Sequence, residues 1–426
     1  MQSQINVKST YLTRPSADVD GIIGIKINCI GEITMKPINI SLLIDTSGSM
    51  EGARIESVKK TIKVLIECLS NDDVITLIGF SSKAKVILSQ VTIDHSNRIS
   101  IIENIEALVA DGGTNLESGI SALGSLQITN SNAVVILTDG DINEGLCSNA
   151  AIYSLVKSYI PTLPIYTLGY GNDHNNELMK TLSSMTRGSY SFIQDEISLP
   201  ESMGDIVGGL KSELLSNATV KFPKEWKCIE PITEGNNTFS VGSIISNKPM
   251  WIMLKVPARS DDKPIEVSYI KTGDTVVNTI TFNADDTSLE RMELLEQMVR
   301  CEMGKIINDV TELMKSNQLL KASEILNKAI ESLNISEAKT RHIVIKMKAQ
   351  IEDILSKVKD ALKNNQSTPN ALVRLASNTS SNYGNQRGVL SGGGALFTSP
   401  MQAQYSRAMS GGYNDEPTNP TASSTI

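Results

Sequence analysis

An aspartate and two serines form a D-x-S-x-S pattern directly after an apolar run. The run covers residues 38–44, and Asp45, Ser47 and Ser49 follow it. Alternate residues of a loop that leaves a strand can turn their oxygen atoms toward one point. Hard oxygen ligands of this kind suit a small hard cation such as Mg²⁺ better than zinc or copper. Because Asp, Ser and Gly are also ordinary turn residues, this pattern needs partners from elsewhere in the chain.

Two further loops carry oxygen groups in similar positions. Thr114 lies in the glycine-rich stretch ADGGTNLESG, after a helical stretch, and Asp139 follows Thr138 at the end of the apolar run in NAVVILTDGD. In open α/β sheets, ligands bind beyond the carboxyl ends of the strands, where loops that are distant in sequence meet. The topology of such a sheet can therefore bring these three loops together.

At these positions the chain resembles the von Willebrand factor type A family. The metal-ion-dependent adhesion site of that family consists of D-x-S-x-S, a threonine from a second loop and an aspartate from a third. The matching residues here are Asp45, Ser47, Ser49, Thr114 and Asp139, with no member missing. The resemblance covers about residues 36–200 and implies a Mg²⁺ or Mn²⁺ site. It also implies that an Asp or Glu of a partner protein supplies the remaining ligand of the metal.

The elements around these loops alternate between strands and helices. Apolar residues at 55, 58, 62, 65 and 69 have the spacing of a helix that covers a sheet, and further helices are expected at 98–108, 116–126, 152–159 and 174–188. Strands are expected at 38–44, 74–78, 85–88, 133–137 and 164–171. This alternation predicts an α/β fold with a doubly wound, mostly parallel, Rossmann-like sheet.

Segments on both sides of this domain have a different pattern. Residues 1–35 and 216–284 contain short strands separated by turn residues, and each set is too small for its own core. We expect the two sets to share a β-sandwich, with the domain at 36–215 inserted between them. Apolar residues at threes and fours then predict a helical hairpin or bundle over 285–364. Residues 365–426 are rich in Ser, Asn, Gly and Thr, which predicts a disordered tail.

The composition restricts the classes of partner and compartment. The 426 residues have a net charge of −8 with acidic and basic residues interspersed, so no basic stripe for nucleic acid exists. No apolar stretch is long enough to span a membrane, and the first residues lack a signal-peptide core. Five cysteines without C-x-x-C spacing indicate free thiols in a reducing compartment. We therefore expect a cytoplasmic protein, whose oligomeric state the sequence leaves open.

Three functions compete at this stage. The first is a protein-binding module or adaptor, in which the metal captures an acidic side chain of a partner protein. The second is a structural scaffold or assembly subunit in which the metal is incidental. The third is a Mg²⁺-dependent phosphatase of the haloacid dehalogenase type, which requires D-x-D. Position 47 is serine, which cannot act as a general acid near neutral pH, so we expect that the protein is not an enzyme.

Overall fold

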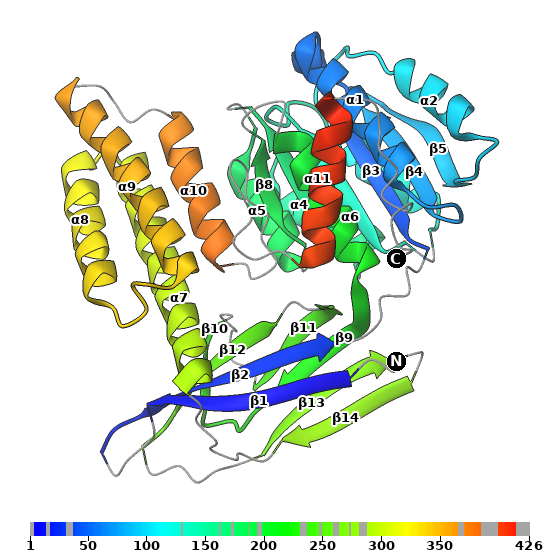
Figure 1. The fold of residues 1–426 in the computed structure, drawn as a ribbon. Coiled ribbons are helices and arrows are strands. Elements are labelled where there is room, and N and C mark those ends of the chain that lie inside the picture. The colour runs from blue at the N-terminus through cyan, green and yellow to red at the C-terminus, as the bar shows by residue number, and fades with distance from the viewer. Residues whose placement is uncertain are drawn as a thin grey trace. The chain divides into compact units, whose positions relative to one another are not determined.

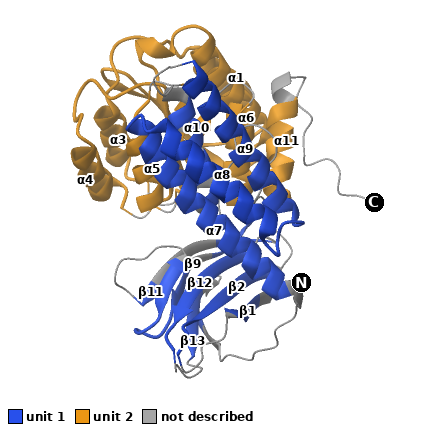
Figure 2. Cartoon of the chain, turned by 90° about the vertical axis from the view of Figure 1, so that its left-hand side faces the viewer, with its two compact units in different colours: residues 1–34, 212–386 blue, residues 35–211, 387–426 orange. Residues whose placement is uncertain are grey.

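The chain forms two compact units, each assembled from segments that lie far apart in the sequence. Met35–Lys211 with Arg387–Ile426 form the sheet unit, and Met1–Thr34 with Ser212–Gln386 form the flanking unit (Figure 2). The computed structural model describes residues 4–13, 18–30, 37–128, 131–161, 163–171, 174–186, 188–193, 198–230, 237–246, 249–258, 264–271, 274–280, 288–364, 370–384 and 399–414.

The sheet unit is built on a six-stranded, mostly parallel sheet (Figure 1). In spatial order its strands are β5 (Ala84–Thr92), β4 (Val74–Phe80), β3 (Asn39–Asp45), β6 (Ala133–Thr138), β7 (Ile165–Tyr170) and β8 (Tyr190–Ile193). Only β5, at one edge, is antiparallel to its neighbour. The connection from β4 to β5 is too short for a crossover, so β5 must return antiparallel. The mostly parallel α/β sheet expected from the sequence is confirmed.

Helices cover both faces of this sheet, because its central strands are apolar on both sides. Leu42 and Ile44 of β3 lie in one hydrophobic cluster, and Leu43 between them lies in the other. The first cluster includes residues of α1 (Ala53–Cys68), α2 (Arg98–Glu106), α6 (Ser198–Lys211) and α11 (Pro400–Asn414). The second cluster includes residues of α3 (Leu116–Ser125), α4 (Asn149–Tyr159) and α5 (Asn176–Met185).

Polar side chains define where the helices of the second cluster begin. Asn115, Ser148 and Asn175 each precede a helix, and each side-chain oxygen accepts a hydrogen bond from a backbone N–H in the first turn. Such caps satisfy backbone donors that have no partner inside the helix. The first of these caps follows Thr114 directly and fixes the end of the loop that carries it.

The flanking unit contains two four-stranded antiparallel sheets. One has the order β1 (Gln4–Thr13), β2 (Gly21–Ile30), β12 (Met250–Val256) and β10 (Lys227–Glu230). The other has the order β11 (Thr238–Ile245), β9 (Glu213–Lys221), β13 (Ile265–Lys271) and β14 (Asp274–Ile280). Strand β2 pairs with β12 along its length, so the two segments that flank the sheet unit in sequence hydrogen-bond to each other. Residues of both sheets lie in one hydrophobic cluster.

The described part of the flanking unit also contains four helices: α7 (Ser288–Lys315), α8 (Leu319–Ile335), α9 (His342–Lys363) and α10 (Asn370–Gly384). Arg300 of α7 is completely buried, and its guanidinium donates to the backbone carbonyl of Tyr383 on α10. The hydroxyl of Tyr383 in turn donates to Oε1 of Gln350 on α9 at 2.6 Å. These contacts hold α10 against α7 and α9.

Two helices, α10 of the flanking unit and α11 of the sheet unit, correct the prediction for the last part of the chain. Residues 365–426 were expected to be disordered, but α10 and α11 lie within them and both have buried side chains. The average composition of the segment is polar, whereas the few apolar residues in it are spaced to lie on one helical face. The prediction is therefore wrong for residues 370–384 and 399–414, and the rest of the segment lies outside the described residues.

Candidate metal centre

Backbone hydrogen bonds join two of the three site loops at the carboxyl edge of the six-stranded sheet. The turn η1 (Gly48–Met50) follows β3, and the backbone N of Gly48 donates to the carbonyl of Gly112 at 3.0 Å. A second bond joins the same two loops, because the backbone N of Asp111 donates to the carbonyl of Thr46 at 2.9 Å. Backbone bonds therefore join the D-x-S-x-S loop to the loop that contains Thr114, before any side chain is considered.

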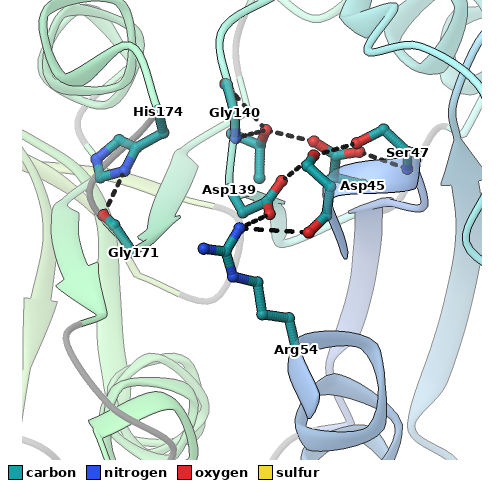
Figure 3. A network of polar contacts seen from close by, with 9 residues as sticks. Asp45, Ser47, Arg54, Asp139, Gly140, Gly171 and His174 are labelled. Carbon is teal, nitrogen blue, oxygen red and sulfur yellow. Dashed lines mark hydrogen bonds and ion pairs between the residues drawn. The ribbon is translucent and has the colours of Figure 1, made fainter. Parts of the chain in front are cut away.

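Side-chain hydrogen bonds connect four of the five predicted site residues (Figure 3). The backbone N of Ser47 donates to Oδ1 of Asp45 at 2.8 Å. The hydroxyl oxygens of Ser47 and Ser49 lie 3.0 Å apart, and Ser49 donates to Oδ1 of Asp139 at 2.8 Å. The structure therefore brings together, at one point, oxygen atoms that are up to 94 positions apart in sequence, from Asp45 to Asp139.

Thr114 lies beside this group, held by its backbone. Its N donates to Oδ1 of Asn143 at 2.8 Å, and its carbonyl accepts from the backbone N of Asn143 at 3.1 Å. A Cβ added to Gly140 would lie 3.6 Å from the hydroxyl oxygen of Ser49 and 3.8 Å from that of Thr114. The hydroxyls of these two residues thus face the same glycine, which places the fifth predicted residue next to the other four.

Two residues that the sequence analysis did not assign also contact the site. Oγ1 of Thr138 donates to Oδ2 of Asp45 at 2.5 Å, so both oxygens of that carboxylate are held. The guanidinium of Arg54 pairs with Oδ2 of Asp139 and donates to the carbonyl of Ser49 at 3.3 Å. A cation in the first turn of α1 opposes the helix dipole, and the pairing with Asp139 offsets this unfavourable position, but no local sequence pattern assigns Arg54 to the site.

Burial raises the pKa of Asp45 above the ordinary value of a carboxyl group. Hydrogen bonds from Thr138 and Ser47 lower that pKa in part, and the negative charge of Asp139 raises it further. Both carboxylates are completely buried, whereas Ser49 is exposed. Two buried negative charges at one point need positive charge nearby, of which Arg54 supplies one to Asp139, and the site is accessible to solvent on the side of Ser49.

The spacing of the oxygen atoms fits an octahedral divalent ion. Mg²⁺ binds oxygen at about 2.0–2.1 Å, so two adjacent ligands of an octahedron lie about 3.0 Å apart. The separations of 3.0 Å between Ser47 and Ser49, and of 2.8 Å between Ser49 and Asp139, are hydrogen-bond distances that adjacent ligands of such an ion would also have. No three His, Cys, Asp or Glu side chains converge anywhere in the described part of the chain. A metal at this edge of the sheet would therefore depend on hydroxyl oxygens as well as carboxylates.

The histidine next to this region has a structural role. His174 is buried, its Nδ1 lies 3.1 Å from the carbonyl of Gly171, and its Nε2 lies 2.9 Å from the hydroxyl of Tyr190 (Figure 3). A Cβ on Gly169 would lie 2.1 Å from the ring, so the imidazole packs directly on the backbone of β7. The side chain fills space between β7 and β8.

Fold and site together define a class of protein domain: a mostly parallel α/β sheet with a cluster of hydroxyl and carboxylate oxygens at its carboxyl edge. Residues 38–192 match the family model described as the von Willebrand factor type A domain. This range runs from the residue before β3 to the third residue of β8. The resemblance expected from the motifs is confirmed for these residues.

Relatives with a similar sequence share only part of their length with this chain. An uncharacterized protein of Synechocystis is 30% identical over 164 residues, which is 37% of this chain and 38% of that protein. A von Willebrand factor A domain-containing protein of Dictyostelium discoideum is 25% identical over 321 residues, which is 71% of this chain and 38% of that protein. The chain thus spans less than two fifths of the length of either relative.

A solved structure extends the similarity of fold beyond the sheet unit. The von Willebrand factor type A protein from Catenulispora acidiphila superposes with a TM-score of 0.68 at 13% identity. The superposition covers 88% of this chain and 96% of that protein. At this level of identity, the likeness shows a shared fold.

Proposed function

We propose that the sheet unit binds a partner protein through a divalent cation. Asp45, Ser47 and Ser49 would hold Mg²⁺ or Mn²⁺ directly, and Thr114 and Asp139 would bind the ion directly or through water. The ion supplies a positive charge that attracts an Asp or Glu of the partner. Mg²⁺ prefers six oxygen ligands and retains several waters, so a carboxylate can replace one of those waters.

One observation carries the proposal: the oxygen of Ser49 lies 3.0 Å from that of Ser47 and 2.8 Å from Oδ1 of Asp139, so hydroxyl and carboxylate oxygens from two loops are close enough to share one ion. Ser49 is exposed, whereas the other four site residues are buried, so only the side of Ser49 is open to solvent. A partner protein would therefore approach the ion from that side. A carboxylate that approaches from this side would meet the ion without displacing a protein ligand.

We further propose a non-enzymatic role in the cytoplasm. The hydroxyls of Ser47 and Thr138 lie beside Asp45, and such groups bind and orient but do not exchange protons near neutral pH. Among the described residues, every helix is too short or too polar to cross a bilayer. A scaffold with an incidental metal remains the alternative, and the test below separates the two.

Calorimetric titration of the full chain with Mg²⁺ and Mn²⁺ tests the site. The wild-type chain should bind one ion, and Asp45→Ala should lose this binding. Asp141→Ala is a matched control, because Asp141 is an exposed acid in the loop that follows β6. If the wild-type chain binds neither metal, the proposal is contradicted and the scaffold is favoured.

Capture of partners from the native cell tests the interaction. The wild-type chain should retain a partner in Mg²⁺ and release it in EDTA, whereas Asp45→Ala should not retain it in either buffer. A partner that is held equally in Mg²⁺ and EDTA would bind elsewhere on the chain and would contradict capture through the metal.

A further inference from the structure

The last helix of the chain packs closely on the sheet unit through two glycines of α6. Helix α11 lies along α6 and also contacts α1 (Figure 1). A Cβ on Gly208 would lie 2.6 Å from the Cα of Gln402, and one on Gly204 would lie 2.5 Å from the Cα of Ser406. For both glycines, the three nearest atoms belong to α11. Glycine at these positions is therefore required by the approach of α11.

One face of α11 fills the groove between α1 and α6. Gln402, Tyr405 and Met409 are buried at helical spacing, whereas Gln404 and Arg407 between them are exposed. Tyr405 and Met409 belong to the same hydrophobic cluster as the buried residues of α1 and α6. The side chains of Tyr405 and Met409 therefore reach the core of the unit. Only this face of α11 carries large apolar side chains that fit there.

The first turn of α11 contains its own cap, and this cap also joins α6. The hydroxyl of Ser399 accepts from the backbone N of Gln402 at 3.2 Å, and the backbone N of Ser399 donates to Oε1 of Gln402 at 2.9 Å. This reciprocal pair is a capping box, and Pro400 occupies the favoured first helical position. Nε2 of Gln402 donates to the carbonyl of Asp205 on α6 at 3.1 Å.

Helix α11 lies far in sequence from the helix on which it packs. Residues 212–386, the greater part of the flanking unit, separate α11 in sequence from the helix on which it packs. A helix of 15 residues with adjacent glycines at 411 and 412 is marginal by itself in water, so its stability depends on the groove. Exchange of an identical element between copies needs no new contact, because each groove receives the same helix.

We propose that the groove between α1 and α6, around Gly204 and Gly208, is a helix-binding site, and that α11 of a second copy of this chain can occupy it in place of the chain's own α11. The interaction does not depend on a metal ion, because its contacts are apolar side chains, a backbone approach and the hydrogen bond from Gln402. Two molecules can therefore associate by exchanging this helix.

Hydrogen exchange of the full chain tests the role of the glycines. Gly208→Ala should raise the exchange rates of the amides of residues 403–410 at least about tenfold, since a tenfold change needs only a small loss of contact energy. Gly411→Ala is the control for an added methyl group and should leave exchange unchanged or slower, because its Cβ would meet nothing beyond its own helix within 4 Å and alanine favours a helix. Equal exchange in the two variants would overturn the assignment of the groove.

A labelled peptide of residues 399–414 tests whether the groove accepts the helix from outside. It should bind saturably to the full chain with Tyr405→Asp, whose own α11 cannot dock. Binding to the wild-type chain should be at least about tenfold weaker, because the tethered helix competes at an effective concentration near the millimolar range.

If Tyr405→Asp does not fold, Gln402→Ala replaces it, since this change removes the cap and the contact to Asp205 but no buried ring. The proposal is overturned if no saturable binding occurs, or if binding persists when Gly208→Ala is added.

Mixing two variants tests the exchange between copies. The chain with Gly208→Ala keeps an intact α11 but has a blocked groove, and the chain with Tyr405→Asp keeps the groove but has a defective α11. Light scattering after size-exclusion chromatography should detect a mixed dimer, in excess of the dimers that either variant forms alone. Only monomers in the mixture, at concentrations where the peptide binds, would overturn exchange between two copies.

Discussion

The carboxylate of Asp139 pairs with the guanidinium of Arg54 through Oδ2, while its Oδ1 accepts a hydrogen bond from Ser49. The side chain of Arg54 is 33% exposed, whereas that of Asp139 is completely buried. A buried carboxylate is unfavourable unless a positive charge lies close to it. The chain therefore carries its own counter-ion at the place where the proposed metal would bring positive charge.

Removal of this counter-ion should strengthen metal binding. Arg54→Gln should raise the affinity for Mg²⁺ about tenfold or more, because the guanidinium repels the incoming ion and occupies one oxygen of Asp139. Calorimetric titration at low ionic strength measures the change. Lys63→Gln, which alters a surface pair on the same helix, should leave the affinity unchanged. Equal binding by Arg54→Gln would show that the guanidinium does not oppose the ion, weaker binding would show that it supports the site, and either result contradicts the prediction.

The hydrogen bond from Thr138 to Asp45 should matter for the metal. Thr138→Val keeps the shape of the side chain but removes the donor to Oδ2, and loss of such an outer partner typically weakens metal binding about 10–100-fold. Thr167→Val is the control, since Thr167 is equally buried in β7 and its hydroxyl donates to the carbonyl of Met179 at 2.8 Å. Equal affinities in the two variants would mean that Asp45 needs no such support.

A buried ion pair at the other end of the sheet should be important for stability. Nζ of Lys211 contacts Oδ1 and Oδ2 of Asp73 at 2.5 and 2.6 Å, and both side chains are completely buried. Lys211→Met should lower the free energy of unfolding by about 3–5 kcal/mol, because it leaves a buried charge without its partner. Lys63→Met should cost less than about 1 kcal/mol, since its pair with Glu106 is on the surface. Urea unfolding measures both, and similar midpoints would contradict the prediction.

The docking of α11 should weaken at alkaline pH. Burial, with the nearby charges of Asp73 and Cys68, raises the pKa of Tyr405 to about 12, and Lys211 provides the positive charge beside Asp73. The proton is bound more tightly in the folded chain than in the unfolded chain, where the pKa is about 10. The contribution of Tyr405 to stability is therefore complete below about pH 10 and is lost as the pH rises toward about 12.

The measurement is the difference in Tm between the wild-type chain and Tyr405→Phe. Burial also raises the pKa of Cys68 to about 11, so both chains should carry Cys68→Ala to isolate the tyrosine. The Tm of the tyrosine chain should fall more steeply than that of the phenylalanine chain between about pH 10 and 12. Parallel curves would show that Tyr405 does not titrate in this range.

The candidate site was largely predictable, because each of its five residues belongs to a local pattern. Asp45, Ser47 and Ser49 follow one strand, and Asp139 follows another, so a parallel sheet must bring them to the same edge. Arg54 was missed because a single basic residue on an amphipathic helix resembles any solvated cation. That these residues bind a metal stays a prediction, which the titrations above test.

The two last helices were not predicted, because their signals are short and lie in a polar segment. In α11 the capping box of Ser399 and Gln402, and the spacing of Tyr405 and Met409, were present in the sequence. Average composition concealed these signals, since only a few residues of the segment become buried. Strand β8 and helix α6 were also missed. The reason for Gly204 and Gly208 in α6 is visible only in the tertiary structure, where α11 packs against them.

The sequence by itself determined the type of sheet and the order of its loops, because apolar runs must be covered on both faces and strand ends must carry the polar groups. The tertiary structure decided which distant segments meet. The pairing of β2 with β12, the packing of α11 on Gly204 and Gly208, and the pairing of Arg54 with Asp139 all join residues at least 85 positions apart. Such contacts depend on how whole elements pack, and no local pattern of side chains specifies them.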